Sequence, residues 1–463
     1  MTDPTNRRRL GLPALVLFGV AYLAPLIVLG TFGVVAQASR GASAASYLLA
    51  LLAMMLTALS YSRMARLMPV AGSAYTYVRN AIDDRVGFMV GWAILLDYLF
   101  LPMVIWLIGA AYLTEAYPAI PAWTWILAFI VLTTVLNVIG FKIAKTANAL
   151  LMGLQFLIIA IFVALAVAYV MSRAGTAGLV SALPFLDPHS GPEAISAGAA
   201  IAAYSFLGFD AVSTLTEEAQ SPQRTVPAAI WLTASIGGGI FILVAYTAQL
   251  VHPGAAFADP AAAAMEIARR IGGAWFAAVL LIGMIIAQLA SGIAAQAAGA
   301  RLIYAMARDG VLPKRGLGRL HPVFGTPAAS VVLTGVVGLL AFGLTVESST
   351  SFINFGAFSA FAAVNLSVIA LWWRGRGHRG DRNAWAWVVA PACGAAIDLW
   401  LLSRLDGRAV RLGLIWVAIG FGVLIHLTRG FRRPTPCLQE PNDSGSPASP
   451  PEPPSAATGA NFR

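Results

Sequence analysis

Charged residues are scarce in this chain. Asp, Glu, Lys and Arg together make up 11% of its 463 residues, whereas hydrophobic residues make up 59%. A soluble globular domain has roughly a quarter of its residues charged, so this composition excludes that class. The formal net charge is +10, but the basic residues are spread over short connections and do not gather on one face, and we therefore expect no nucleic-acid partner.

Cysteine and catalytic motifs are also nearly absent. Cys393 and Cys437 are the only two cysteines, which supports neither a disulfide framework nor a thiolate metal site. The chain contains no H-E-x-x-H, no G-x-S-x-G and no phosphate-binding loop, the patterns that place a base, a nucleophile or a phosphate cradle in a defined geometry. We therefore expect no enzyme activity, no metal and no cofactor.

Long apolar stretches fill most of the sequence. A helix needs roughly 20 apolar residues to cross a bilayer, and the chain has about twelve stretches of that kind. The sequence thus predicts an all-α membrane protein with about twelve transmembrane helices. The predicted spans cover 13–36, 43–62, 86–113, 122–140, 147–171, 194–216, 228–251, 274–306, 327–346, 351–373, 384–403 and 411–428.

Basic residues predict how the chain sits in the membrane. Three arginines occupy 7–9, and the connections on the same side collect most of the 30 Lys and Arg, so by the positive-inside rule both termini are cytoplasmic. The competing interpretation is a signal peptide cleaved after the Ala-Gln-Ala sequence at 36–38, but the first apolar run is far longer than a signal peptide needs. Residues 1–12 and 434–463 are then cytoplasmic tails, and the Pro, Ser and Gly content of the second predicts disorder.

Two of the predicted spans contain helix-breaking residues. In the first, Pro25 lies mid-span and is followed by Gly30 and Gly33; in the sixth, Gly208 precedes Asp210 by two residues. An interrupted helix survives in hydrocarbon only where it lines a cavity or is packed by neighbours. The simpler interpretation is that Pro and Gly only kink these helices. Because both interruptions occupy the same place in two five-span halves, they indicate a secondary transporter built from inverted repeats.

Four motifs carry a family resemblance. They are SYSRMARLMPVAGSAYTYV (60–78), GFMVGWAILLDYLFLP (87–102), SFLGFDAVSTLTEEAQSPQRTVPAAI (205–230) and ARLIYAMARDGVLPK (300–314). In this order they resemble the amino acid, polyamine and organocation permease superfamily, and most of all its bacterial putrescine importers and related amino acid permeases. The resemblance runs from about residue 11 to residue 432.

The resemblance implies a fold and a mode of action. The transporter core would cover 13–373 as two inverted five-helix repeats, 13–171 and 194–373, with two peripheral helices at 384–428. Discontinuous spans one and six would form the substrate site, with spans three, eight and ten around it. Such a protein would import an amino acid or a polyamine such as putrescine across the bacterial cytoplasmic membrane by alternating access.

Carboxylates inside apolar spans are the first candidate site residues. An ionised carboxylate at mid-bilayer costs on the order of 3 kcal/mol, so it normally faces a cavity or a partner. Asp210, just after the break in span six, and Asp97, in span three, are candidates for binding a substrate ammonium group and for carrying a coupling proton. For each, the alternative is a structural hydrogen bond. The resemblance associates the acidic residue of FLGFD with gating and coupling.

Glu217 and Glu218 end span six at its cytoplasmic side, where the prolines that follow stop the helix. We expect them to form an ion pair of an inner gate, with Arg224 or Arg301 as the partner, or a solvated helix end. Direct contact with the substrate is the less favoured role. Asp398, in the peripheral eleventh span, is interpreted as a structural contact.

The remaining candidate substrate contacts surround the two breaks and lie on span eight. Aromatic side chains at the second break can stack on a cationic or apolar substrate, and polar residues of span eight can reach it. Close helix packing explains the same residues equally well. The residues are Ala24, Pro25, Leu26, Gly30, Tyr204, Phe206, Leu207, Gly208, Gln288 and Ser291.

Gly30 bears on the identity of the substrate. By the resemblance, a putrescine importer would have an acidic residue at this position, where this chain has glycine. In this chain Asp97 and Asp210 would therefore have to hold both ammonium groups of a diamine. An amino acid needs one ammonium acceptor and one anion site, which exposed amides at helix N-termini provide and Gly30 leaves accessible. The sequence leaves both substrates open.

The absence of histidine from the middle of the predicted spans bears on the coupling ion. None of the five histidines lies at mid-membrane, so a proton carrier would be a carboxylate, and we favour proton symport. Sodium coupling and exchange are the alternatives, although among oxygen ligands near spans one and eight only Ser291 stands out. A channel or a transport-dead sensor is less favoured, because polar residues sit at isolated breaks and the tails contain no signalling domain.

Overall fold

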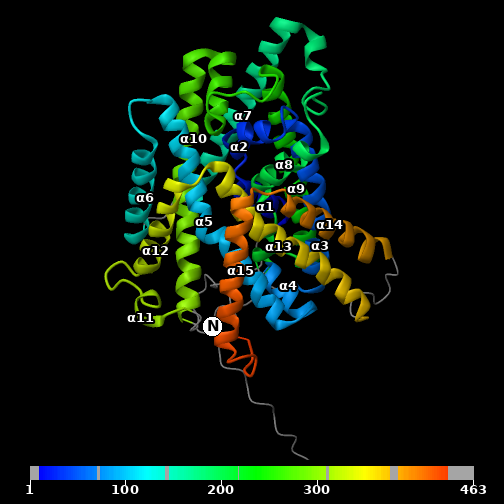
Figure 1. Cartoon of the computed structure of the whole chain (residues 1–463), viewed down its shortest axis with the longest axis vertical. Coiled ribbons are helices and arrows are strands. Elements are labelled where there is room, and N and C mark those ends of the chain that lie inside the picture. Colours follow the sequence, from blue (N-terminus) through cyan, green and yellow to red (C-terminus); the bar gives the residue numbers. More distant parts are fainter. Residues whose placement is uncertain are drawn as a thin grey trace, which may run out of the picture.

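The computed structural model describes residues 10–69, 73–140, 145–216, 218–308, 312–375 and 384–435. Figure 1 shows a bundle of helices in which α5, α10 and α15 run along the long axis of the molecule. The described residues form no strand, and an isolated backbone bridge pairs Leu10 with Ala219. The prediction of an all-α protein is therefore confirmed.

Each of the predicted spans is helical. Within the described ranges, nine helices are long and apolar enough to cross a membrane, and the bent pair α1–α2 makes a tenth. The other two predicted spans are the shorter apolar helices α6 and α12–η6. The segments that form the spans are α1 (Leu12–Leu23), α2 (Ile27–Ala38), α3 (Ser43–Leu67), α5 (Asp84–Ala116), α6 (Ala122–Val138), α7 (Lys145–Ala174), α8 (Pro192–Ala202), η3 (Ala203–Phe206), η4 (Asp210–Leu215), α9 (Pro222–Val251), α10 (Ala263–Arg308), α12 (Ala328–Gly338), η6 (Leu339–Gly343), α13 (Val346–Trp373), η7 (Trp385–Val389), α14 (Ala390–Ser403) and α15 (Gly407–Leu427).

Local sequence sets where several helices begin. Pro192 and Pro222 occupy the first turns of α8 and α9, where a missing amide hydrogen costs no helical hydrogen bond. Asp83 caps α5, because its carboxylate accepts a hydrogen bond from the Arg85 amide at 2.8 Å. Apolar composition sustains these helices over lengths that match the bilayer.

Glycines allow α5 to pack closely against its neighbours. A Cβ atom at Gly299 of α10 would lie 2.5 Å from the Tyr98 carbonyl oxygen, and one at Gly356 of α13 would lie 2.5 Å from the Ala93 carbonyl oxygen. No real side chain tolerates such a distance to backbone, so both positions require glycine. The three helices predicted to surround the substrate site thus form one tightly packed unit.

Spans five apart along the chain pack against one another. α3 packs along α9, α5 along α10, and α2 against α8. Two structurally related halves would produce this pairing, although the inverted repeat itself stays a prediction. α14 packs on α13 and α3, and α15 packs on α13 and α5 while leaving most of its surface exposed, as a peripheral helix facing lipid would.

Some connections contain structure that the spans alone do not predict. α4 (Ser73–Ala81) packs against α5 and α13, and the short elements η2 (Thr176–Leu179), η5 (Pro260–Ala262) and α11 (Lys314–Leu317) lie in other connections. α10 also begins well before the predicted boundary at 274. The chain bends at Gly273, where φ is 67°, and the predicted span starts at the next residue. Cys393 is exposed on α14, and Cys437 lies outside the described residues.

Candidate substrate site between two broken helices

The first predicted span is broken where the sequence indicates. α1 and α2 meet at an angle of 50°, and the break covers Ala24, Pro25 and Leu26. Ala24 has a φ of 47°, the left-handed conformation that ends a helix. Pro25 and Leu26 are buried and Ala24 is partly exposed, so the unwound chain lies inside the bundle.

The sixth predicted span is broken as well. The α-helical part ends at Ala202, a 3-10 turn continues to Phe206, and Leu207 is extended before η4 resumes at Asp210. Gly208 has a φ of 115°, which only glycine adopts readily. A Cβ atom at Gly208 would overlap the ring of Tyr22 in α1, so the two broken spans meet at this point. The prediction of two discontinuous helices is confirmed.

Side chains from other spans bind the interrupted backbone. The Leu26 amide donates to the Gln155 side-chain oxygen of α7 at 3.4 Å. The Tyr112 hydroxyl of α5 donates to the Leu29 carbonyl at 2.8 Å, and the Asn354 amide of α13 donates to the Ala200 carbonyl at 2.7 Å. These contacts supply partners that the hydrocarbon cannot, and so stabilise both breaks.

A buried hydroxyl cluster joins the two broken spans directly. The Thr31 hydroxyl of α2 lies 3.0 Å from the Tyr47 hydroxyl of α3 and 3.4 Å from the Ser205 hydroxyl of η3. All three side chains are buried. Spans one, two and six are thereby held together by polar contacts at the depth of the breaks.

Asp210 begins η4 immediately after the second break. The Ser73 hydroxyl of α4 donates to its Oδ2 atom at 3.4 Å. An aromatic cluster lies beside it, in which the Tyr61 ring contacts those of Tyr77, Phe209 and Phe361 edge-on at centroid distances between 5.8 and 6.0 Å. Asp210 is partly exposed although it lies deep in the bundle, and it forms no ion pair with a described cationic residue.

Asp97 lies near the middle of α5. Its Oδ1 atom is buried and has no hydrogen-bond partner among the described residues. Asp97 is near enough to Asp210 and to Tyr204 for a charge on Asp97 or Asp210 to bear on its neighbour, so these groups share one region between α5 and the second break. The described residues provide no cation to neutralise this pair of carboxylates, which is a costly arrangement unless a cationic guest or protons bind there.

Span eight contributes two further polar groups. Gln288 of α10 is 4% exposed, and its amide forms no hydrogen bond within the described part of the chain. Ser291 is partly exposed one turn further along the same helix. Tyr204 is 5% exposed and is likewise without a hydrogen-bond partner among described residues. Gln288, Ser291 and Tyr204 stay predicted ligand contacts.

Phe206 and Gly30 are packing positions in this conformation. The Phe206 ring is fully buried and packs edge-on against Phe241 of α9 at 5.2 Å. A Cβ atom at Gly30 would lie 3.0 Å from Ile108 and 3.3 Å from Met284, so a larger side chain would have to displace α5 or α10 contacts. Both residues stay predicted substrate contacts.

Of the predicted gate residues, Glu218 lies at the end where α1 begins. Glu217 is outside the described residues, and Glu218 is exposed and forms no ion pair with any described residue. Its carbonyl accepts a hydrogen bond from the Leu10 amide at 3.1 Å, and the Gln220 amide donates to the Leu10 carbonyl at 2.9 Å. A backbone bridge thus ties the start of α1 to the end of span six.

Asp398 lies away from the breaks, between α14 and its neighbours. It is fully buried, and its Oδ2 atom accepts hydrogen bonds from Thr57 and Asn365, each at 2.9 Å. These partners agree with the interpretation of Asp398 as a structural contact between α3, α13 and α14.

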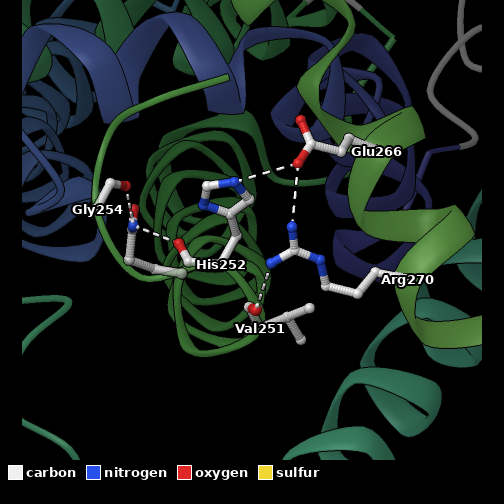
Figure 2. Close-up of polar contacts among 6 residues, drawn as sticks. Val251, His252, Gly254, Glu266 and Arg270 are labelled. Carbon is white, nitrogen blue, oxygen red and sulfur yellow. Dashed lines mark hydrogen bonds and ion pairs between the residues drawn. The ribbon is translucent and has the colours of Figure 1, made fainter. Parts of the chain in front are cut away.

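A polar network fixes the loop between α9 and α10 at the end of the bundle where α2 ends. Figure 2 shows Glu266 between His252 and Arg270, with its Oε1 atom 3.3 Å from His252 Nε2 and 3.1 Å from Arg270 Nη2. Arg270 also donates to the Val251 carbonyl at 3.4 Å, and Gln249 donates to the carbonyls of His252 and Gly254. These contacts hold the loop in one conformation.

The same loop covers α2. The Phe257 ring lies 4.3 Å from the His252 ring and 5.8 Å from the Phe32 ring of α2, measured between centroids. Because Gly33 of α2 has no side chain, the Pro260 carbonyl of η5 can pack directly against α2. Residues 252–262 therefore form a cover over the half-helix that follows the first break.

Comparison with known proteins places the chain in a family. It matches the family described as amino acid permease over residues 14–424. The chain belongs to the amino acid permease family. The permease is 40% identical over 436 residues to the low-affinity putrescine importer PlaP of Escherichia coli, an alignment that covers 94% of this chain and 96% of PlaP.

More distant relatives have other names. The permease is 25% identical to the branched-chain amino acid permease BcaP of Bacillus subtilis, with 92% of this chain and 94% of the relative covered. It is 27% identical to the methylthioribose transporter of the same organism, with 84% and 86% covered. Transporters named for chemically different substrates are therefore similar in sequence to this chain, and the substrate has to be argued from the site itself.

Sequence reasoning missed the side chains that stabilise the breaks. Gln155, Tyr112 and Asn354 contact the interrupted backbone, and none was a candidate. Gln155 and Asn354 are isolated polar residues in apolar runs, and this is the same signal that identified Asp97. The hydroxyl cluster carried no comparable signal, because Ser and Thr are common in membrane helices.

Proposed function

We propose that this permease imports a small cationic or zwitterionic nitrogen compound, an amino acid or a polyamine such as putrescine, across the bacterial cytoplasmic membrane. Transport would proceed by alternating access and be coupled to protons. The observation that carries the proposal is the buried Oδ1 atom of Asp97, which has no hydrogen-bond partner among the described residues, together with Asp210 at the second break; neither carboxylate forms an ion pair with a described cation. A substrate ammonium group would supply that balance.

Putrescine is the first candidate substrate. A diamine has two ammonium groups, and two carboxylates deep in the bundle match them in number and charge. The 40% identity with a putrescine importer over nearly the whole chain supports this choice. Gly30 requires that Asp97 and Asp210 do this without a third carboxylate from the first break.

An amino acid is the second candidate. Its ammonium group would bind Asp97, and its carboxylate would lie near the amides freed at the first break, where the Leu26 amide has only a long hydrogen bond to Gln155. The similarity to BcaP supports this alternative.

Carboxylates would also carry the coupling proton. Asp97, whose Oδ1 atom lacks a hydrogen-bond partner among described residues, is our first candidate, and Asp210 is the second. Glu217 and Glu218 would act at the inner gate, where the bridge between Leu10 and Ala219 would have to separate when the site opens. Sodium coupling and exchange remain the competing mechanisms.

Orientation and organisation complete the proposal. Both termini would be cytoplasmic, since the ends of α5, α10 and α15 that lie near the N-terminal bridge carry Arg85, Arg308 and Arg429. The core would comprise inverted repeats at 13–171 and 194–373, with 384–428 peripheral.

An uptake assay in cells or proteoliposomes tests this function. Putrescine and a panel of amino acids are offered to the parent, to Asp97→Asn and to Asp210→Asn, with Glu193→Gln as a control because Glu193 is an exposed carboxylate. We expect each Asn variant to lower uptake of the preferred substrate about tenfold or more, because each removes a charged hydrogen-bond acceptor from a buried site. The control should match the parent.

Two outcomes of the assay would contradict the proposal. If both Asn variants take up the preferred substrate as the parent does, neither carboxylate binds it. If uptake by the parent survives an uncoupler but stops when sodium is replaced, the coupling ion is sodium and the proton mechanism is wrong.

A further inference from the structure

An apolar cavity lies outside the substrate site, between α5, α10, α12 and α15. Its volume is about 150 Å³. In the view of Figure 1, α12 and α15 lie on either side of α10. The lining side chains are apolar except for the indole nitrogens of Trp and the hydroxyl of Tyr. They include Trp92, Tyr98, Leu302, Leu333, Val337 and Trp416.

The polar atoms of the two lining indoles are satisfied by the wall itself. Trp92 Nε1 donates to the Trp416 carbonyl at 2.9 Å, and Trp416 Nε1 donates to the Trp92 carbonyl at 2.8 Å. The two rings also stack at 5.1 Å between centroids. An apolar cavity offers water too few hydrogen-bond partners, so its favourable occupant is hydrocarbon.

The cavity extends toward the basic end of the bundle. Leu312 lines it, and the same hydrophobic cluster includes Phe88 near the start of α5 and Leu424 near the end of α15. The basic side chains at these helix ends are Arg85, Arg308, Lys314, Arg429, Arg432 and Arg433.

Acidic groups offset little of this positive charge. The Asp84 carboxylate is 2.9 Å from Arg79 Nε, and the Asp83 carboxylate caps α5 through the Arg85 amide. Asp309 lies outside the described residues. Arg308 and Lys314 each lie two residues from a residue that lines the cavity, so positive charge lies near this end, which favours an anionic ligand.

We propose that this cavity binds a segment of one acyl chain of an anionic phospholipid, with the phosphate group held by the basic side chains at the helix ends. The cavity lies between helices that face the bilayer, its lining accepts hydrocarbon, and its border has the charge that attracts an anionic headgroup. A hydrophobic chain and a phosphate group belong to one molecule only in a lipid.

The bound lipid would contact the helices that form the substrate site. Tyr98 lines the cavity and is the residue after Asp97 on α5, and Gly299 of α10 lies both in the cavity wall and against the Tyr98 carbonyl. Occupation of the cavity would therefore stabilise the contact between α5 and α10. The proposal does not depend on which substrate the permease carries.

Native mass spectrometry of the purified full-length permease tests the proposal. The protein in mild detergent receives equal amounts of phosphatidylglycerol and phosphatidylcholine of matched chain length. We expect one phosphatidylglycerol to be retained about tenfold more than phosphatidylcholine. Leu302→Trp and Leu333→Trp, which fill the cavity from two different helices, should each abolish retention, whereas Val131→Trp on the exposed face of α6 should not.

The headgroup contact has its own variants. Arg85→Gln and Lys314→Gln should each lower retention of phosphatidylglycerol about fivefold, while Arg40→Gln, at the opposite end of the bundle, should leave it unchanged. Equal retention of the two lipids by the parent would overturn the charge argument. Retention of phosphatidylglycerol by both cavity-filling variants would overturn the proposal as a whole.

Discussion

The break in the sixth span depends most directly on one residue, Gly208. Its φ of 115° is unfavourable for any side chain, and a Cβ atom there would overlap the Tyr22 ring of α1. Asp210 follows two residues later, so the position of the carboxylate is set by this backbone conformation. The glycine thereby determines both the break and the packing of α1 on it.

We therefore expect Gly208→Ala to destabilise the permease by about 2 kcal/mol and to reduce uptake strongly. The matched control is Gly239→Ala, since Gly239 lies in α9 with open space around its Cβ position and alanine favours a helix. Apparent Tm values at one scan rate and uptake of the preferred substrate provide the measurements. Wild-type Tm and uptake in Gly208→Ala would contradict this role.

At this scale the sequence predicts individual residues only in part. Asp97, Asp210 and Gly208 are identifiable because a charge or a glycine is conspicuous in an apolar span. The rotation of a helix is not predictable in the same way, so the sequence could not show that the Phe206 ring packs against Phe241. Gln155 was missed because the partner of a freed amide comes from a span far away in the sequence.

At the scale of elements, the cover over α2 is held by a compact polar network. Glu266 contacts both His252 and Arg270, and the loop packs through Phe257 on α2. The Glu266–Arg270 ion pair is partly exposed, and the His252 contact is an ion pair only when the imidazole is protonated, so together they contribute on the order of 1 kcal/mol.

We expect Glu266→Gln to accelerate hydrogen–deuterium exchange of the 252–262 segment about fivefold, because the variant loses the ion pair with Arg270 and weakens the contact with His252 while it keeps the size of the side chain. Asp84→Asn, which breaks an ion pair with Arg79 at the other end of the bundle, is the matched control. Mass spectrometry of peptides from the permease in detergent provides the rates. Equal rates in the parent and Glu266→Gln would show that the network does not hold the cover.

The sequence predicts which segments span the membrane, but it does not predict the helices in the connections between them. Each predicted span coincides with helical structure because hydrophobic length is a strong signal. α4 and the first part of α10 were missed, since short helices outside the membrane depend on packing against the bundle. The boundary at 274 was correct in one respect, because the helix bends at Gly273.

At the scale of the whole molecule, the sequence-based expectation was that two halves face one another across the breaks. The packing of α3 with α9, α5 with α10 and α2 with α8 agrees with such an arrangement. Sequence alone could suggest it only through the matching positions of Pro25 and Gly208 and through the four family motifs. Which side chains meet between the halves depends on helix rotation and tilt, and these are set by contacts such as Gly299 on the Tyr98 carbonyl.

The most direct test of the central claim is an experimental structure of the permease in lipid nanodiscs with its preferred substrate bound. The account predicts helices interrupted at 24–26 and at 207–209, and a substrate ammonium group about 3 Å from a carboxylate oxygen of Asp97 or Asp210. Continuous helices at either position, or substrate bound away from both carboxylates, would contradict it.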